Sequence, residues 1–208
     1  MRLLTAFRLL SLAGPVALSA QASTSPLCYH ARPKPACSAF AFTSFGPYLM
    51  LGGGRNAGTP LREVADWGVM VNAGTKDAVG GAVFASLDRD GFALGPAAHY
   101  RRWLSASASV EVAVGTPLVT STGDDLRPGS VFGLVKWSPN DWFSLAARPE
   151  LVRWTPVTGC GPTGCVTARR TRGRLSVGME AGRLPGAVLT AVGAAAGLFL
   201  AAVVAAVD

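Results

Sequence analysis

SASASVEVAVG, residues 105–115, is the stretch that decides the fold class. From Ala106 to Val114, small and apolar residues alternate with serines and with Glu111. Successive side chains of a β-strand point to opposite faces, whereas a helix repeats every 3.6 residues, so only a strand produces this period of two. The stretch therefore predicts a strand with one apolar face and one polar face.

The same pattern extends in both directions from this stretch. Residues 79–87 and 91–104 also alternate, and Asp88-Arg-Asp-Gly91 and Ser138-Pro-Asn-Asp141 have the composition of tight turns. Most of the resulting strands exceed the usual five or six residues of soluble sheets and approach the length that a tilted strand needs to cross a bilayer. We predict eight strands, at 47–54, 64–73, 78–88, 91–103, 106–115, 129–137, 142–154 and 167–182.

An up-and-down order of these strands puts short and long connections at opposite ends. The short ones are 74–77, 104–105 and 138–141, and the opposite end has 55–63, 89–90, 116–128 and 155–166, three of them long. Short turns on one side and long loops on the other resemble bacterial outer-membrane β-barrels. The resemblance covers residues 47–182 at the level of the class. It implies an all-β, antiparallel up-and-down meander or barrel whose main partner is a lipid bilayer.

Three tryptophans, Trp103, Trp137 and Trp142, fall near the short-turn end. In a membrane barrel they are candidates for the aromatic girdle at the membrane interface, and in a soluble domain they would pack in a core.

Charged residues also fall within the predicted strands: Arg101, Glu111, Arg148, Glu150 and Glu180. Inside a small barrel they would pair with one another, because isolated buried charges are costly; on a soluble sheet they would face water. An eight-stranded barrel is filled by side chains or holds one small ligand, so we expect no open pore.

The N-terminus, MRLLTAFRLLSLAGPVALSAQAS, has the composition of a secretory signal. Arg2 and Arg8 are basic, a short apolar stretch follows, and Ala20-Gln21-Ala22 is a small-x-small cleavage site. We predict a signal peptide at 1–22, with an uncleaved anchor as the alternative, and an irregular lead-in at 23–46.

Export implies an oxidising compartment, in which four cysteines form two disulfides. Of the three possible pairings, proximity favours Cys28 with Cys37 and Cys160 with Cys165. A metal site at Cys28, His30 and Cys37 is the alternative, but it lacks a paired C-x-x-C and a fourth ligand, so we predict no metal.

Residues 186–207 contain no charge and are rich in Ala, Val, Leu and Gly. As a helix, about 22 residues would span roughly 33 Å, enough to cross a bilayer core. Gly193 and Gly197 form a small-xxx-small pattern through which such helices self-associate. The alternative is two short apolar strands that turn at 193–197.

Composition narrows the function classes. Hydrophobic residues make up 50% of the chain and charged residues 15%, against roughly 25% charged in ordinary domains. The net charge is +7, and the densest basic cluster is Arg169, Arg170, Arg172 and Arg174, which is typical of a solvated strand end or a lipid-facing rim. We therefore expect no nucleic-acid partner.

The sequence contains no recognisable catalytic or nucleotide-binding motif. No G-x-S-x-G occurs, and Gly52-Gly-Gly54 fails the spacing of a nucleotide-binding loop. His99 is the one strand residue that ordinarily titrates near neutrality, and we expect it to make a structural hydrogen bond. We predict no catalytic residue, no cofactor and no enzyme activity.

The sequence thus predicts a cell-envelope membrane protein, in the outer membrane, with a structural or small-apolar-ligand-binding role. A second hypothesis is a periplasmic β-domain that is tethered to the inner membrane by residues 186–207 and binds a lipid or a protein. A third is a lipid-acting envelope enzyme that uses His99 and a nearby serine.

Overall fold

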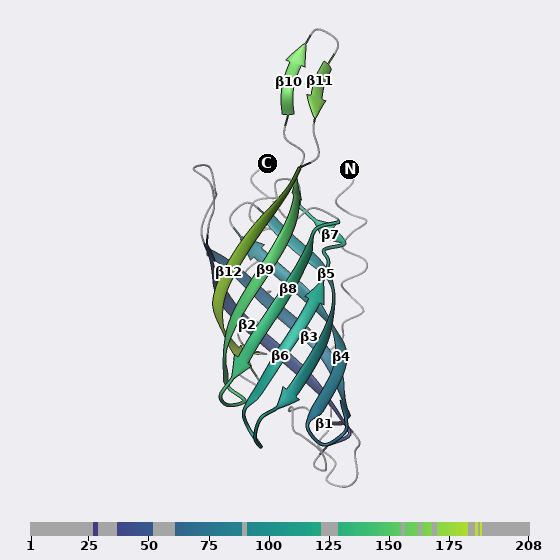
Figure 1. The fold of residues 1–208 in the computed structure, drawn as a ribbon, viewed down its shortest axis with the longest axis vertical. Coiled ribbons are helices and arrows are strands. Elements are labelled where there is room, and N and C mark those ends of the chain that lie inside the picture. The colour runs from purple at the N-terminus through teal and green to yellow at the C-terminus, as the bar shows by residue number, and fades with distance from the viewer. Residues whose placement is uncertain are drawn as a thin grey trace, which may run out of the picture.

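The computed structural model describes residues 27–28, 37–51, 61–88, 91–121, 129–154, 157–161, 164–167, 170–182, 186 and 188. Eight long strands form one closed antiparallel barrel in up-and-down order (Figure 1). They are β2 (Ala39–Leu51), β3 (Leu61–Ala73), β4 (Asp77–Asp88), β5 (Gly91–Trp103), β6 (Ser109–Gly115), β8 (Val131–Ser138), β9 (Phe143–Trp154) and β12 (Arg170–Gly182).

The barrel closes because the first and last long strands pair with each other. β12 pairs antiparallel with β2 from Leu175 opposite Leu51 to Gly182 opposite Ser44, while its other edge pairs with β9. β2 also pairs along most of its length with β3. Closure leaves none of the eight strands with an open edge, and it confirms the predicted all-β barrel.

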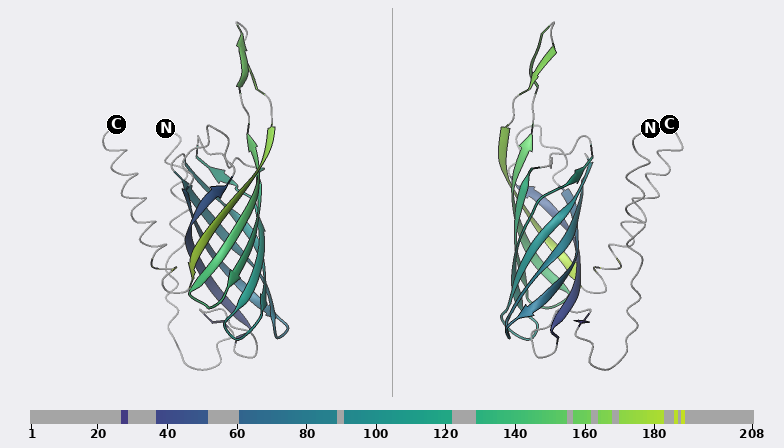
Figure 2. Two further views of the ribbon diagram at one scale, coloured as in Figure 1. Left: turned by 60° about the vertical axis from the view of Figure 1, so that its left-hand side comes forward. Right: turned by 90° about the vertical axis from the view of Figure 1, so that its right-hand side faces the viewer.

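Four short strands lie outside this ring. β1 (Leu27–Cys28) pairs parallel with the start of β2, and β7 (Val119–Thr120) pairs with β5. β10 (Val157–Gly161) and β11 (Gly164–Thr167) form a separate hairpin. Figures 1 and 2 show this hairpin projecting beyond the end of the barrel.

The connections divide between the two ends as expected. The short turns 74–76, 104–108 and 139–142 lie together at the lower end in Figure 1, which we call the short-turn end. Gly74 adopts a φ of 85° in the first of these turns, a left-handed conformation that glycine adopts without strain. The other connections lie at the opposite, long-loop end.

Several strand boundaries were predicted wrongly: β3 begins at Leu61 rather than at residue 64, β12 begins at Arg170 rather than at residue 167, and the largest difference is at the first long strand. The first long strand begins at Ala39 rather than at Pro47, so residues 39–46 belong to the sheet and not to an irregular lead-in. Phe40, Phe42 and Ser44 point inward there, but they alternate with Ala and Thr, so hydropathy shows no contrast.

The predicted strand over 106–115 begins at Ser109, because residues 104–108 form a turn. The Ser105 hydroxyl accepts hydrogen bonds from the backbone N–H groups of Ser107 (3.3 Å) and Ala108 (3.0 Å). Serine side chains that hydrogen-bond to the nearby backbone compete with strand pairing. The alternation of Ser and Ala looks like a strand and gives no sign of this turn.

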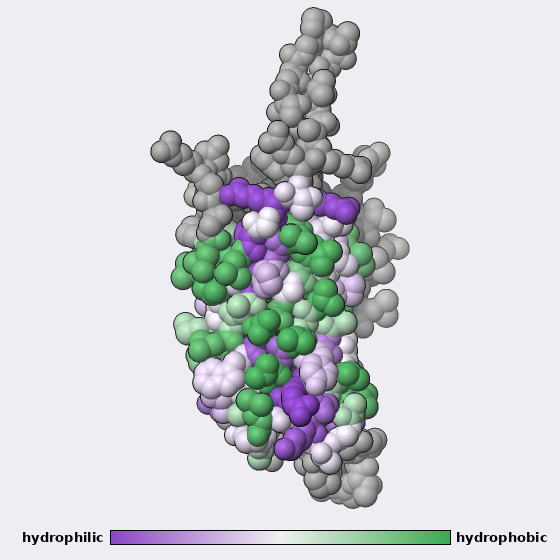
Figure 3. All heavy atoms as spheres, in the orientation of Figure 1, coloured by the Kyte–Doolittle hydropathy of each residue, from purple (hydrophilic) through white to green (hydrophobic). Residues whose placement is uncertain are grey.

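The barrel interior contains charged side chains beside apolar ones, whereas many large apolar side chains lie on the outer wall. Arginine, lysine, glutamate and aspartate side chains are buried inside the barrel, while Val, Leu and other apolar side chains on the outer wall are exposed. Figure 3 shows apolar side chains over much of the wall on one face, with hydrophilic ones gathered at the upper rim and towards the lower end.

A disulfide joins Cys28 to Cys37, as predicted, and ties β1 to the start of β2. Cys160 and Cys165 lie directly opposite each other in the register of the β10–β11 hairpin, and their bond stays a prediction.

The predicted signal peptide (1–22), Gly193, Gly197 and nearly all of the predicted helix at 186–207 lie outside the described residues. In the part of the chain that the structure describes, no helix is long and apolar enough to span a membrane.

Candidate functional site

The lower half of the barrel interior is organised around Glu111 on β6. Arg101 on β5 and Lys136 on β8 are its direct neighbours in register, so the three side chains meet on the inner face. Arg101 Nε donates a hydrogen bond of 2.6 Å to Glu111 Oε2, and Lys136 Nζ lies 3.0 Å from Glu111 Oε1. Lys136 Nζ also donates to Glu180 Oε2 at 3.0 Å, and the Tyr48 hydroxyl donates to the other oxygen of Glu180.

His99 joins the same group, which we call the Glu111 cluster: Tyr48, His99, Arg101, Glu111, Lys136 and Glu180. His99 Nδ1 lies 2.9 Å from Glu111 Oε1, and the ring packs edge-on against Phe42 at 5.2 Å between centroids. Within the described residues, its Nε2 has no hydrogen-bond partner. The geometry therefore brings His99 to a carboxylate, as expected for a structural hydrogen bond, and no described hydroxyl bonds to its ring.

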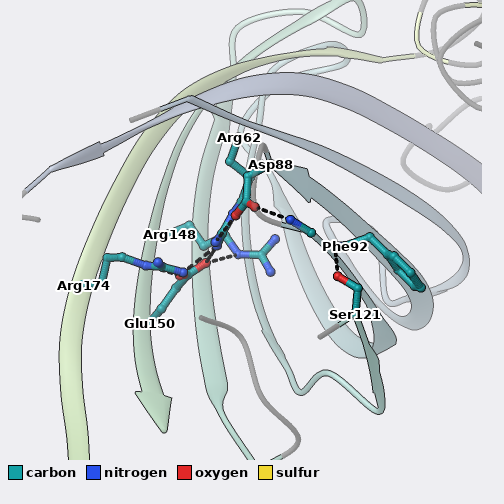
Figure 4. Close-up of polar contacts among 8 residues, drawn as sticks. Arg62, Asp88, Phe92, Ser121, Arg148, Glu150 and Arg174 are labelled. Carbon is teal, nitrogen blue, oxygen red and sulfur yellow. Dashed lines mark hydrogen bonds and ion pairs between the residues drawn. The ribbon is translucent and has the colours of Figure 1, made fainter. Parts of the chain in front are cut away.

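A second group lies towards the long-loop end and centres on Glu150 of β9; we call it the Glu150 cluster: Arg62, Asp88, Arg148, Glu150 and Arg174 (Figure 4). Glu150 Oε1 accepts hydrogen bonds from Arg62 Nη1 (3.1 Å) and Arg148 Nε (3.0 Å). Its Oε2 accepts one from Arg174 Nε at 2.8 Å. Three guanidinium groups from three strands thus converge on one carboxylate.

The Glu150 cluster continues to the rim of the barrel through Asp88. Arg62 Nη2 donates to Asp88 Oδ2 at 2.8 Å, and the other Asp88 oxygen accepts the backbone N–H of Gly91 at 3.0 Å. Beside it, the backbone N–H of Phe92 donates to the Ser121 hydroxyl at 2.9 Å, next to the β5–β7 pairing (Figure 4). The charges therefore also fix the loop end of β4 and β5.

Two aromatic rings also lie in the barrel interior, beside the Glu150 cluster. Phe84 and Phe132 are fully or almost fully buried and meet edge to face, with their ring centroids 4.6 Å apart. The Arg148 guanidinium lies over both rings, 3.6 Å from the centroid of Phe132 and 5.0 Å from that of Phe84. This stacking packs aromatic rings against the Glu150 cluster.

The interior charges balance. Its strongly basic side chains are Arg62, Arg101, Lys136, Arg148 and Arg174, and its carboxylates are Asp66, Asp88, Glu111, Glu150 and Glu180. Among the residues that the structure describes, these are five basic and five acidic side chains. Burying charges costs several kcal/mol for each ion unless the charges are paired and hydrogen-bonded. All ten side chains form ion pairs except Asp66, whose Oδ2 accepts a hydrogen bond from the Ser44 hydroxyl at 3.5 Å.

Sequence reasoning found half of this network. The prediction that Arg101, Glu111, Arg148, Glu150 and Glu180 lie inside the barrel and pair with one another is confirmed for Arg101–Glu111 and Arg148–Glu150. Glu180 is also buried, but its partners are Lys136 and Tyr48, which were not predicted. The missed members are Tyr48, Arg62, Asp66, Asp88, Lys136 and Arg174. The two-residue period of the strands could have revealed these residues, because each of them lies an even number of residues from other inward-facing positions on its strand.

The predicted tryptophan girdle is wrong at Trp103. Its side chain is only 2% exposed, packs against Phe40 with ring centroids 6.1 Å apart, and places its Nε1 3.4 Å from Asn72 Oδ1. Trp103 is two residues from the inward-facing Arg101, so the strand period places it inside. Trp137 (47% exposed) and Trp142 (55% exposed) lie on the outer side at the short-turn end, where a girdle requires them.

A polar cavity of about 50 Å³ opens below the Glu111 cluster at the short-turn end. Ser109, Ser138 and Ser144 contribute hydroxyls to its lining, and the last two bond to each other at 2.7 Å. Its volume is enough to hold water molecules. Among the residues that the structure describes, no three or more His, Cys, Asp or Glu side chains are grouped to hold a metal ion.

Comparison with known proteins adds no relative: no family model matches the chain, and neither a curated protein nor a solved structure is significantly similar to it.

Proposed function

We propose that this protein is an integral membrane β-barrel of a bacterial-type cell envelope, without a channel and without catalysis. One observation carries the proposal: apolar side chains project from the outer wall on all eight long strands. Each strand has at least one that is 45% or more exposed: Leu49, Val69, Val83, Phe92, Val114, Val135, Leu151 and Met179.

A soluble barrel would gain stability from the opposite arrangement. Apolar surface costs about 25 cal/mol per Å² in water, and monomeric soluble proteins rarely expose contiguous apolar patches above a few hundred Å². Here the apolar belt faces outward while charged side chains are paired inside. In the hydrocarbon core of a bilayer, the apolar outer wall is no longer exposed to water, so this cost disappears. The closed ring also leaves no strand edge with unpaired backbone groups in lipid. The same belt argues against a soluble periplasmic domain.

The role that fits this geometry is structural. The interior is occupied by the two charged clusters and the Phe84–Phe132 pair, so ions and solutes have no bore to follow. The long-loop end carries the projecting β10–β11 hairpin, which the rigid barrel would hold at the membrane surface. The barrel thus acts as a membrane-embedded base for the segments at that end.

The proposal is tested by the contact of single tryptophans with lipid. In two variants that retain only Trp137 or only Trp103, the other tryptophans being replaced by Phe, the protein is reconstituted into vesicles that contain brominated lipids. We expect strong quenching of Trp137, which faces outward, and little quenching of Trp103, which is buried inside. Equal and weak quenching of both would overturn the membrane assignment, and single-channel current steps in a planar bilayer would overturn the closed interior.

A further inference from the structure

The polar cavity at the short-turn end is lined by two buried cationic side chains. Arg101 and Lys136 both belong to its lining, and both are buried. Among the lining residues that the structure describes, Asp141 is the one carboxylate, and Glu111 is not part of the lining. The lining therefore carries two positive charges against one negative charge.

Glu111 holds both cations but uses only part of their hydrogen-bonding capacity. Arg101 contacts Glu111 Oε2 through Nε and Nη2, and Lys136 Nζ lies 3.0 Å from both Glu111 Oε1 and Glu180 Oε2. A guanidinium group has five N–H donors and an ammonium group has three, so N–H donors of both side chains remain for another acceptor. Glu111 cannot supply it, because its Oε1 also lies 2.9 Å from His99 Nδ1 and each of its oxygens already has two contacts.

Aromatic rings surround the Arg101 guanidinium without satisfying these donors. The guanidinium carbon lies 5.4 Å from the ring centroid of Phe40, 5.6 Å from that of Phe42 and 5.5 Å from that of Trp103. Phe42 and Trp103 also line the cavity. Apolar walls lower the local dielectric constant, so the attraction between the Arg101 charge and a nearby anion is stronger here than in water.

Hydroxyl groups supply further donors on the other side of the cavity. Ser109 on β6 lies opposite Ser138 on β8 in register, and the hydroxyls of Ser138 and Ser144 on β9 are 2.7 Å apart. All three serines are buried and line the cavity. The cavity thus combines a guanidinium group, an ammonium group and hydroxyls, which are hydrogen-bond donors suited to an anion.

We propose that this cavity binds one small monovalent anion, of the size of a halide or formate ion, through Arg101 and Ser109. The single charge matches the excess of one positive charge in the lining. The volume of about 50 Å³ is a few times the roughly 10–15 Å³ that one water molecule needs, so an ion of this size fits. The inference goes beyond the proposed function and does not depend on it, because the cavity lies inside the barrel and not on the wall that would face lipid.

Trp103 provides a fluorescent reporter within the cavity. Iodide and caesium are both heavy ions that quench tryptophan on contact, but they have opposite charges. Both are titrated, at constant ionic strength, against the full-length variant that retains only Trp103, in micelles of a neutral detergent. We expect saturable quenching by iodide, much weaker quenching by caesium, and recovery of the fluorescence when chloride or formate displaces iodide.

Two serine variants locate the bound anion. Ser109→Ala removes a donor from the cavity, whereas Ser86→Ala is the matched control, since Ser86 is a buried serine on β4 that does not line the cavity. A hydrogen bond to a charged partner contributes about 1.5 kcal/mol or more, so Ser109→Ala should raise the iodide concentration at half-saturation about tenfold. Ser86→Ala should leave it unchanged, and Arg101→Gln should abolish the saturable quenching.

Heated and unheated gel samples verify that each variant retains the closed barrel, and the comparison of the two serine variants decides the matter if Arg101→Gln does not fold. Equal quenching of Trp103 by iodide and caesium, or quenching by neither, would show that the cavity holds water only and would overturn the proposal. Equal half-saturation in Ser109→Ala and Ser86→Ala would show that iodide reaches Trp103 from elsewhere and would also overturn it.

Discussion

Replacing Glu111 by Gln removes the carboxylate that organises the lower half of the interior. Glu111 is fully buried and contacts Arg101 Nε at 2.6 Å, His99 Nδ1 at 2.9 Å and Lys136 Nζ at 3.0 Å. The substitution preserves the shape of the side chain and changes the formal interior charge from zero to one positive charge.

The structure sets the size of the effect. Breaking a buried ion pair by removing one partner costs about 3–5 kcal/mol, because the other charge stays buried without compensation. Lys136 keeps Glu180 as a partner, so the main loss is at Arg101. We therefore expect Glu111→Gln to lower the free energy of unfolding by about 3 kcal/mol, towards the lower end of that range.

The assay is equilibrium unfolding by urea in detergent micelles, followed by tryptophan fluorescence and by the unheated gel band. Glu63→Gln is the matched control, since Glu63 is exposed on the outer side of β3 and its loss should change stability by no more than about 0.5 kcal/mol. Arg101→Gln added to Glu111→Gln restores interior neutrality, and the coupling between the two sites should be about 1–3 kcal/mol. Equal stabilities of Glu111→Gln and Glu63→Gln would refute the account of an interior stabilised by buried, paired charges.

Three further predictions follow from particular positions. Gly80→Ala should destabilise the barrel by about 1–3 kcal/mol, because the new methyl group would collide with the Val69 carbonyl and Met70, whereas Gly81→Ala should be neutral or slightly stabilising, with Ala97 O 3.8 Å away; urea unfolding compares the two. Val83→Arg, on the outer wall, should reduce stability in vesicles by about 2–4 kcal/mol and Val83→Leu by much less, and equal effects would argue against a lipid-facing wall. Cys28→Ser should leave the closed-barrel gel band intact, because β2 pairs along both edges with β3 and β12 without the disulfide, and loss of that band would contradict the closure described above.

The alternation of apolar and polar residues along the strands was the feature that the sequence showed most clearly. The alternation around Val110, Val112 and Val114 predicted the strand class, and the up-and-down order predicted which turns share an end. The sequence also predicted that charged residues such as Arg101 and Glu111 would pair inside a barrel, without saying which residue pairs with which. Such features depend on local patterns, which a single sequence displays directly.

The remaining features depend on contacts that a single sequence does not display. The convergence of Arg62, Arg148 and Arg174 on Glu150 requires the register between β12 and β9 and closure of the ring. Trp103 was misplaced because it falls at the short-turn end with Trp137 and Trp142, while its strand parity, shared with Arg101, places it inside. An apolar groove lined by Ala147, Val177 and Pro47 arises from three strands side by side, and none of them shows it alone.

The central claim is that a closed barrel lies in a membrane with its apolar wall facing lipid. Membrane fractionation, with each fraction run on SDS gels before and after heating, tests both parts of that claim in one experiment. The account predicts recovery in the outer-membrane fraction with an unheated band that migrates faster than the heated one. Recovery in the soluble periplasmic fraction, or in the inner membrane with no shift on heating, would contradict it.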